Sequence, residues 1–139
     1  KKIIDLGDFL SRNRLANLFL DTMPYGAHKT FSDALWSGLP VITKIGQTFA
    51  SRVGASLLNA VDLPELITET DEDYKNLAIE LGLNPEKISK IKLKLENNKL
   101  NKPLFNTKLF TKNIESAYTE IYKKHFSNLP ITNIELKNY

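Results

Sequence analysis

The sequence contains no cysteine and only two histidines, His28 and His125, among its 139 residues. The absence of cysteine excludes disulfide bonds and thiolate chemistry, and two histidines are too few for a histidine-rich metal site. No apolar run approaches the roughly 18–20 residues of a membrane span, and no signal-peptide-like segment opens the sequence. We therefore expect a cytoplasmic protein that binds no metal.

The remaining composition is typical of a globular domain, because 42% of the residues are hydrophobic and 25% are charged. The charge is uneven: residues 86–139 hold 11 Lys and 5 acidic residues, whereas residues 1–85 hold 8 Lys and Arg and 11 acidic residues. A basic half can meet nucleic acid or an anionic partner. Its lysines recur at helical spacing with few aromatic residues between them, which favours solvated helix faces. The sequence begins Lys-Lys-Ile without a Met, so we expect it to be part of a longer protein.

The N-terminal half alternates between strand-like and helix-like segments. The predicted order is a strand at 16–21, a helix at 29–37, a strand at 40–43, a helix at 51–61 and a short strand or turn at 63–68. Gly38 and Pro40 are expected to end the first of these helices, and Ser51 to cap the second. Trp36 is expected to pack in the core or between helices. Such alternation predicts right-handed βαβ units and a parallel sheet.

After residue 70 the pattern becomes helical. We predict helices at 71–82, 84–98 and 106–126. Asn84 is the expected N-cap of the second, with Pro85 at its first position. The last helix carries an apolar stripe that is expected to face inward: Phe110, Ile114, Ala117, Tyr118 and Ile121. The predicted fold class is therefore α/β, a small parallel sheet with C-terminal helices, in one domain at 1–126 with a tail at 127–139.

Polar side chains gather in the loop that joins the first predicted strand to its helix. In open parallel sheets, ligands bind beyond the carboxyl ends of the strands, and a helix N-terminus suits phosphate. His28, Lys29, Thr30 and Ser32 can add donors and positive charge there, and Asp33 is expected in the first helical turn. Simpler interpretations stay open: the hydroxyls as caps, His28 as a loop residue, Lys29 as an exposed charge and Asp33 as a partner of the helix dipole.

Three stretches, in this order, carry a resemblance to a known family. They are LANLFLDTMPYGAHKTFSDALWSGLPVIT, GQTFASRVGASLLNAVDLPELIT and PLFNTKLFTKNIESAYTEIYKKH. Together they resemble the C-terminal part of the O-GlcNAc transferase family, especially its bacterial members, from about Leu10 to His125. The resemblance implies the GT-B fold, with two Rossmann-like halves and often tetratricopeptide repeats. This chain is similar to the half that holds the UDP of a UDP-sugar.

The resemblance also implies roles for individual residues. The family's His-Thr-Thr, which holds the pyrophosphate, falls on His28, Lys29 and Thr30. The family's Asp in the following turn, which is important for activity, falls on Asp33, and its Arg near the nucleotide falls on Arg12. We expect Asp33 and Lys29 to act in catalysis, with Lys29 supplying charge that a metal supplies elsewhere. The family needs no metal and no cofactor apart from the donor substrate, UDP-GlcNAc or a related UDP-sugar.

Two positions depart from the family's pattern. Phe9 stands where the family often has a His near the uridine, and it can stack on a base but cannot form that hydrogen bond. Lys29 replaces the first Thr, which would preserve a backbone contact but change the side-chain contact. The expected function is the UDP-sugar-binding half of an inverting transferase that moves GlcNAc from UDP-GlcNAc to Ser or Thr of proteins, inactive alone.

Three alternatives remain open at this point. The first is a related transferase that uses another UDP-hexose, with Asn as a possible acceptor. The second is a non-catalytic nucleotide-binding or interaction module, which the changes at Phe9 and Lys29 favour. The third is a basic nucleic-acid-binding domain. The preferred interpretation names a UDP-sugar, an acceptor protein and the N-terminal GT-B half with its repeats as partners, and neither nucleic acid nor a membrane.

Overall fold

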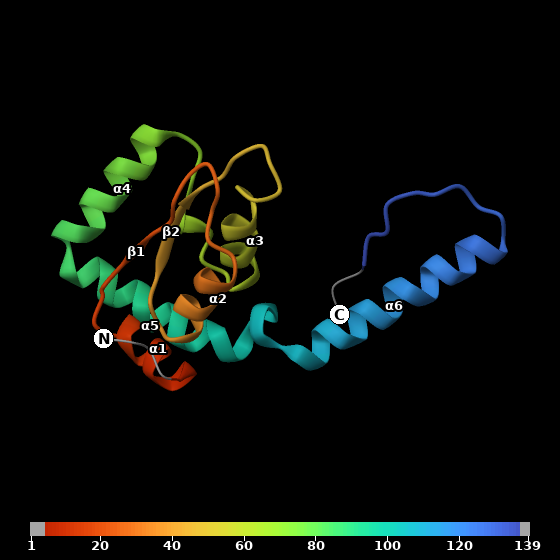
Figure 1. The fold of residues 1–139 in the computed structure, drawn as a ribbon, viewed down its shortest axis with the longest axis horizontal. Coiled ribbons are helices and arrows are strands. Elements are labelled where there is room, and N and C mark those ends of the chain that lie inside the picture. The colour runs from red at the N-terminus through yellow and green to blue at the C-terminus, as the bar shows by residue number, and fades with distance from the viewer. Residues whose placement is uncertain (1–4, 137–139) are drawn as a thin grey trace. The chain divides into compact units, whose positions relative to one another are not determined.

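The computed structural model describes residues 5–136, which form two compact units divided after Leu104 (Figure 1). The first unit is built on a three-stranded parallel sheet of order β1-β2-β3. Its strands are β1 (Phe19–Leu20), β2 (Val41–Lys44) and β3 (Ile67–Thr68). Phe19 aligns with Val41, and Thr43 with Ile67. The predicted α/β class with a parallel sheet is confirmed.

Helices surround this sheet. They are α1 (Leu6–Asn13), α2 (Lys29–Trp36), α3 (Val53–Ala60), α4 (Asp71–Leu83) and α5 (Pro85–Asn101), with a 3₁₀ turn, η1 (Pro64–Leu66). A second 3₁₀ turn, η2 (Pro103–Phe105), spans the division between the two units. In Figure 1, α4 lies on one side of the strands and α3 on the other. The sheet is therefore covered on both faces, which is the arrangement that parallel sheets require.

Local signals in the sequence account for several helix ends. The Asn84 side chain accepts a hydrogen bond from the Lys87 amide, and Pro85 opens α5, as the sequence predicts. After Ser37, the C-cap of α2, Gly38 adopts a φ of 84°. Glycine reaches this left-handed conformation without steric cost, so the chain can turn directly from α2 into β2.

The core lies where α2, β2, α3 and α5 meet. Its fully buried large side chains include Phe31, Leu35, Ile42, Leu58 and Leu95. Each comes from an apolar position of a segment that the sequence pattern predicts. Burying a side chain of this kind stabilises the fold by about 1.5–3 kcal/mol.

One expectation about this unit is wrong, and a second is confirmed in one of its two alternatives. Ser51 does not cap α3, because its hydroxyl accepts a hydrogen bond from the Thr48 amide within the preceding turn, and the N-cap residue is Arg52. Trp36 is 46% exposed, so of its two expected positions it occupies the one between helices, where α2 meets α5, and not the core. The ammonium group of Lys99 lies 5.9 Å from the centroid of its ring, so Trp36 sits at the surface beside α5.

The second unit, from Phe105 on, contains α6 (Thr107–Phe126) followed by residues 127–136 without regular secondary structure. No α6 residue is buried among those described, and Phe110 and Tyr118 are each 65% exposed. Ile114 and Ala117 of the expected stripe are half-buried. Within this unit only an irregular segment is present to cover the helix, so the inward packing of the whole stripe stays a prediction.

The predicted division into a domain at 1–126 and a tail at 127–139 stays a prediction. Residues 137–139 of that tail lie outside the described residues. Within residues 5–136, none of the helices combines the length and apolar character needed to cross a bilayer.

Candidate functional site

The loop 22–28 leaves the sheet at the carboxyl end of β1 and leads directly into α2. Asp21 extends the parallel ladder by one residue, because its amide donates to the Ile42 carbonyl at 3.1 Å. The loop then runs through Pro24 and Gly26 to His28, which precedes the first residue of α2. The predicted juxtaposition of strand end, loop and helix start is present in the structure.

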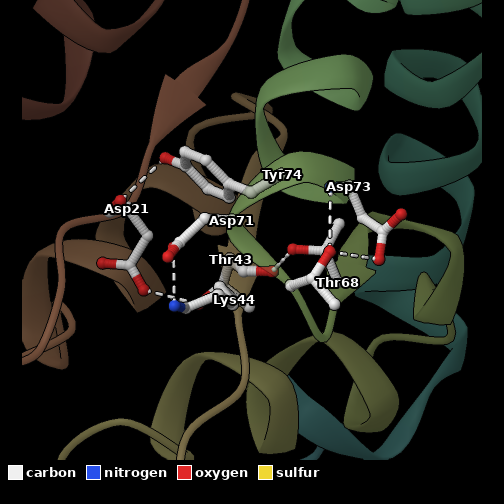
Figure 2. Close-up of polar contacts among 8 residues, drawn as sticks. Asp21, Thr43, Lys44, Thr68, Asp71, Asp73 and Tyr74 are labelled. Carbon is white, nitrogen blue, oxygen red and sulfur yellow. Dashed lines mark hydrogen bonds and ion pairs between the residues drawn. The ribbon is translucent and has the colours of Figure 1, made fainter.

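The loop is closed by the side chain of Asp21, which is only 5% exposed. Its Oδ1 accepts hydrogen bonds from the amides of Thr22, at 2.9 Å, and Ala27, at 2.7 Å. Its Oδ2 accepts from the hydroxyl of Thr43 on β2 at 2.7 Å (Figure 2). We call this arrangement of Asp21, Thr22, Ala27 and Thr43 the Asp21 clamp. Both ends of the loop and the neighbouring strand are thus tied to one carboxylate.

The clamp is tied to the other strands and to α4. The Thr68 hydroxyl on β3 donates to the Thr43 carbonyl at 3.1 Å, and the Tyr74 hydroxyl on α4 donates to the Asp21 carbonyl at 2.7 Å (Figure 2). Burial, and then the negative charge of Asp21, raises the pKa of Tyr74 above its ordinary value of 10.0. These contacts keep the neutral phenol as a hydrogen-bond donor.

The N-terminus of α2 has no side-chain cap. His28 is the N-cap residue and makes no capping hydrogen bond with its side chain. Thr30 and Ser32 lie within the helix, so neither is the cap that one interpretation of the sequence allowed. The first amides of a helix have no intrahelical acceptor. Here they begin one residue beyond the Asp21 clamp, beside the exposed Thr30 side chain.

The His28 ring is held between two loops. It stacks on Tyr25 with ring centroids 5.1 Å apart and meets Phe49 edge-on at 6.0 Å. Its Nε2 lies 3.3 Å from the Ala50 carbonyl oxygen. When Nε2 carries the proton it donates to that carbonyl, which leaves Nδ1 for another partner. His28 therefore links the loop before α2 to the loop before α3.

Lys29 and Asp33 form an ion pair on α2. The Lys29 ammonium lies 2.6 Å from Asp33 Oδ2, with side chains 78% and 19% exposed respectively. Asp33 is the fifth residue of the helix, so it lies beyond the first turn in which it was expected. The same ammonium is 6.0 Å from the centroid of Phe9 on α1. The structure thus brings together Lys29, Asp33 and Phe9, and both Phe9 and Lys29 depart from the family's pattern.

Arg12 lies in the last turn of α1 and is exposed. It lines a surface pocket of about 470 Å³ together with Phe9, Asn13, Leu15 and Ala16. Helix α1 packs against α2, but within residues 5–136 no hydrogen bond or ion pair joins Arg12 to residues 28–33. Arg12 is therefore a neighbour of the junction through Phe9 rather than a member of its network.

Within residues 5–136, no group of three or more His, Cys, Asp or Glu side chains is arranged to hold a metal ion. The expectation that the protein uses no metal stays a prediction. Sequence reasoning assigned no role to Asp21, Thr43 or Tyr74. The available signal was a polar residue at the end of each of two successive apolar runs, since the carboxyl ends of parallel strands meet at one edge.

Comparison with known proteins identifies a family and several relatives that resemble this chain. Residues 4–114 match the model of the family described as glycosyl transferase family 41. A UDP-N-acetylglucosamine–peptide N-acetylglucosaminyltransferase of Caenorhabditis elegans is 31% identical over 91% of this chain and 11% of its own length. A probable enzyme of the same name, SEC, of Arabidopsis thaliana is 35% identical over 86% of this chain and 12% of its own length. The chain thus spans about an eighth or less of these relatives.

A solved structure agrees in fold. The Thermobaculum terrenum O-GlcNAc transferase, determined as a mutant, matches with a TM-score of 0.82 and 30% identity, over 87% of this chain and 23% of that one. The fold is therefore the Rossmann-like one of a GT-B glycosyltransferase half, with C-terminal helices, as the resemblance implied. The sequence match over most of the chain and the structural match agree, and the chain belongs to glycosyl transferase family 41.

Proposed function

We propose that this chain is the UDP-sugar-binding half of an inverting protein O-glycosyltransferase that transfers GlcNAc from UDP-GlcNAc to Ser or Thr. Relatives that carry this activity in their names support the donor and the protein acceptor. Because the chain spans only a small part of those relatives, the acceptor groove is proposed to lie in an N-terminal GT-B half, with tetratricopeptide repeats upstream. The whole protein is proposed to be cytoplasmic and to bind neither nucleic acid nor a membrane.

The observation that carries the proposal is the uncapped N-terminus of α2 at the carboxyl end of a parallel strand. Free helix amides and the positive end of the helix dipole favour a diphosphate. Lys29 adds a cation and Thr30 a hydroxyl at this point, and His28 offers its free ring nitrogen. Arg12 is proposed to approach the nucleotide from α1.

Glycosyl transfer builds negative charge on the departing UDP. Preorganised donors at the position of that charge lower the barrier, and the loss of one such donor costs about 2.7–4 kcal/mol in related oxyanion sites. In the proposal, Lys29 stabilises the leaving diphosphate without a metal ion, and Asp33 holds the Lys29 ammonium through their ion pair. No cofactor other than the donor substrate takes part. The chain alone is inactive, because a cleft enzyme needs both walls to align donor and acceptor.

The test is a calorimetric titration of the full-length protein with UDP, with ADP as the control nucleotide. UDP-selective binding that is lost in the double variant Thr30→Ala, Asp33→Ala supports the site. If the double variant binds UDP as tightly as wild type, the nucleotide binds elsewhere and the proposed site is wrong. If Lys29→Ala leaves UDP affinity unchanged, Lys29 does not have the proposed role. Competition among UDP-GlcNAc, UDP-glucose and UDP-galactose then identifies the sugar, and selection of another hexose would favour the related transferase instead.

A non-catalytic nucleotide-binding module is the second candidate. The observation that favours it is the proximity of Phe9 and Lys29, the two departures from the family pattern, with the Lys29 charge already paired to Asp33. In that case the full-length protein binds UDP or an acceptor protein but transfers no sugar. Incubation with radiolabelled UDP-GlcNAc and cell protein distinguishes the two, because only a transferase labels protein.

A further inference from the structure

Asp21 is buried next to the proposed diphosphate site but does not face it. Its carboxylate accepts from the amides at both ends of the loop, Thr22 and Ala27. Ala27 immediately precedes His28, the N-cap residue of α2. The hydrogen bond from the Ala27 amide to Asp21 therefore holds the chain one residue before the N-cap of α2, and so positions the first turn of that helix.

The carboxylate has little freedom to move. Its second oxygen is held by the Thr43 hydroxyl at 2.7 Å. Glycines form the adjoining walls: a Cβ on Gly26 would lie 3.0 Å from Asp21 Oδ2, and one on Gly54 would lie 3.1 Å from it. Because α3 and the loop approach this closely, any displacement of Asp21 displaces the loop, and any loosening of the loop must break a charge-assisted hydrogen bond.

We propose that Asp21 is a positioning residue, whose carboxylate holds the loop 22–27 so that the first amides of α2 and the His28 ring face the donor diphosphate. This inference rests on the proposed function. A carboxylate suits the role because both of its oxygens accept, and three donors converge on it. Substituting such an orienting carboxylate typically costs about 10–100-fold where it orients metal ligands.

The experiment compares UDP affinity in variants of the full-length protein. Asp21→Ala is expected to weaken UDP binding about 10-fold or more. Asp21→Asn keeps the volume and one acceptor oxygen for the two amides, and the Thr43 hydroxyl can rotate to accept from the new amide. It is therefore expected to recover most of the affinity.

A matched control separates positioning from loss of stability. Asn98 on α5 donates to the carbonyls of Val61 and Asp62, away from the loop. Asn98→Ala removes these hydrogen bonds and lowers stability, yet its UDP affinity is expected to stay within about 2-fold of wild type. Amide hydrogen exchange at Ala27, His28 and Thr30 is expected to accelerate in Asp21→Ala and not in Asn98→Ala.

The outcomes are distinct. Wild-type protein that binds UDP, with Asp21→Ala binding as tightly as Asn98→Ala, overturns this inference and leaves the proposed function intact. Wild-type protein that does not bind UDP overturns the proposed function and this inference with it. If Asp21→Ala does not fold, Thr43→Val decides: UDP binding about 3-fold weaker supports positioning, since one of the three hydrogen bonds is lost, and unchanged affinity overturns it.

Discussion

Two carboxylates, Asp21 and Asp33, lie within one strand–loop–helix unit but differ in their burial and in their hydrogen-bond partners. Asp21 is 5% exposed and accepts from two amides and a hydroxyl. Within residues 5–136, the Asp33 carboxylate is paired only with Lys29, whose own side chain is 78% exposed. The first carboxylate is fixed by contacts that reach across the sheet, whereas the second is held by a residue one helical turn away.

The difference teaches how one edge of a sheet can serve both stability and binding. A buried carboxylate must have its hydrogen bonds satisfied, so its oxygens are occupied by partners within the fold. The ion pair between Lys29 and Asp33 contributes little to stability because the Lys29 side chain is exposed, so Lys29 can contact a ligand without a large cost to the fold. The Asp21 clamp therefore stabilises the edge, and His28, Lys29 and Thr30 remain available for the proposed diphosphate.

The largest expected effect comes from removing the clamp. Asp21→Ala removes the acceptor of the buried Thr43 hydroxyl and of the part-buried Thr22 and Ala27 amides. It is expected to lower the free energy of unfolding by about 3 kcal/mol, since a buried donor without a partner costs about 1–3 kcal/mol. Urea denaturation measures this loss. A change below about 0.5 kcal/mol would mean that the Asp21 carboxylate is no more important to the fold than that of Asp33.

A change in the wall of the clamp is expected to have the next largest effect. A Cβ on Gly54 would lie 2.7 Å from Phe31 Cε2 and 2.9 Å from Thr43 Oγ1. Gly54→Ala is therefore expected to destabilise by about 2 kcal/mol through overpacking. Gly82→Ala is the matched control, because nothing lies within 4 Å of a Cβ there. It is expected to stabilise α4 by about 0.5–1 kcal/mol, and equal melting temperatures for the two variants would contradict the close packing of α3.

Tyr74→Phe tests the link from α4 to the clamp. Loss of the hydrogen bond to the Asp21 carbonyl is expected to cost about 1 kcal/mol. Because the folded state raises the pKa of Tyr74, its contribution is complete below the unfolded pKa of about 10 and is lost as the pH rises through the folded pKa. Urea denaturation from about pH 8 to about pH 11 should show a shallower alkaline decline in Tyr74→Phe than in wild type. Parallel curves would contradict the assignment.

The smallest change in stability is expected at the exposed pair. Lys29→Ala and Asp33→Ala should each alter the free energy of unfolding by only about 0.3–0.5 kcal/mol, the value of an exposed i,i+4 ion pair. Lys29→Ala should nevertheless weaken UDP binding, more strongly at low salt than at high salt, because salt screens exposed charge. Calorimetry at two salt concentrations measures this change in affinity. A Lys29→Ala protein that loses stability but keeps its UDP affinity would contradict the contrast drawn between Asp21 and Asp33.

Much of the fold follows from local sequence signals. Asn84 with Pro85, and Gly38 followed by Pro40, act over a few residues, so the start of α5 and the end of α2 can be predicted from the sequence. The candidate junction at His28–Asp33 was predictable for the same reason, together with the rule that parallel strands present their carboxyl ends at one edge. Burial on α6 was not predictable, because an apolar stripe indicates which face prefers contact but not what covers it.

The sequence by itself therefore determined the order of strands and helices from β1 to α6 and the placement of the loop before α2, but it did not predict α1. Only the tertiary structure decided that Asp21 is a clamp, because its partners Thr43 and Tyr74 lie 22 and 53 residues away along the chain. Whether a carboxylate is buried and satisfied or left at the surface depends on which strands and helices become its neighbours. That is a property of the assembled sheet, since solvent exclusion and hydrogen-bond geometry arise only when distant segments pack together.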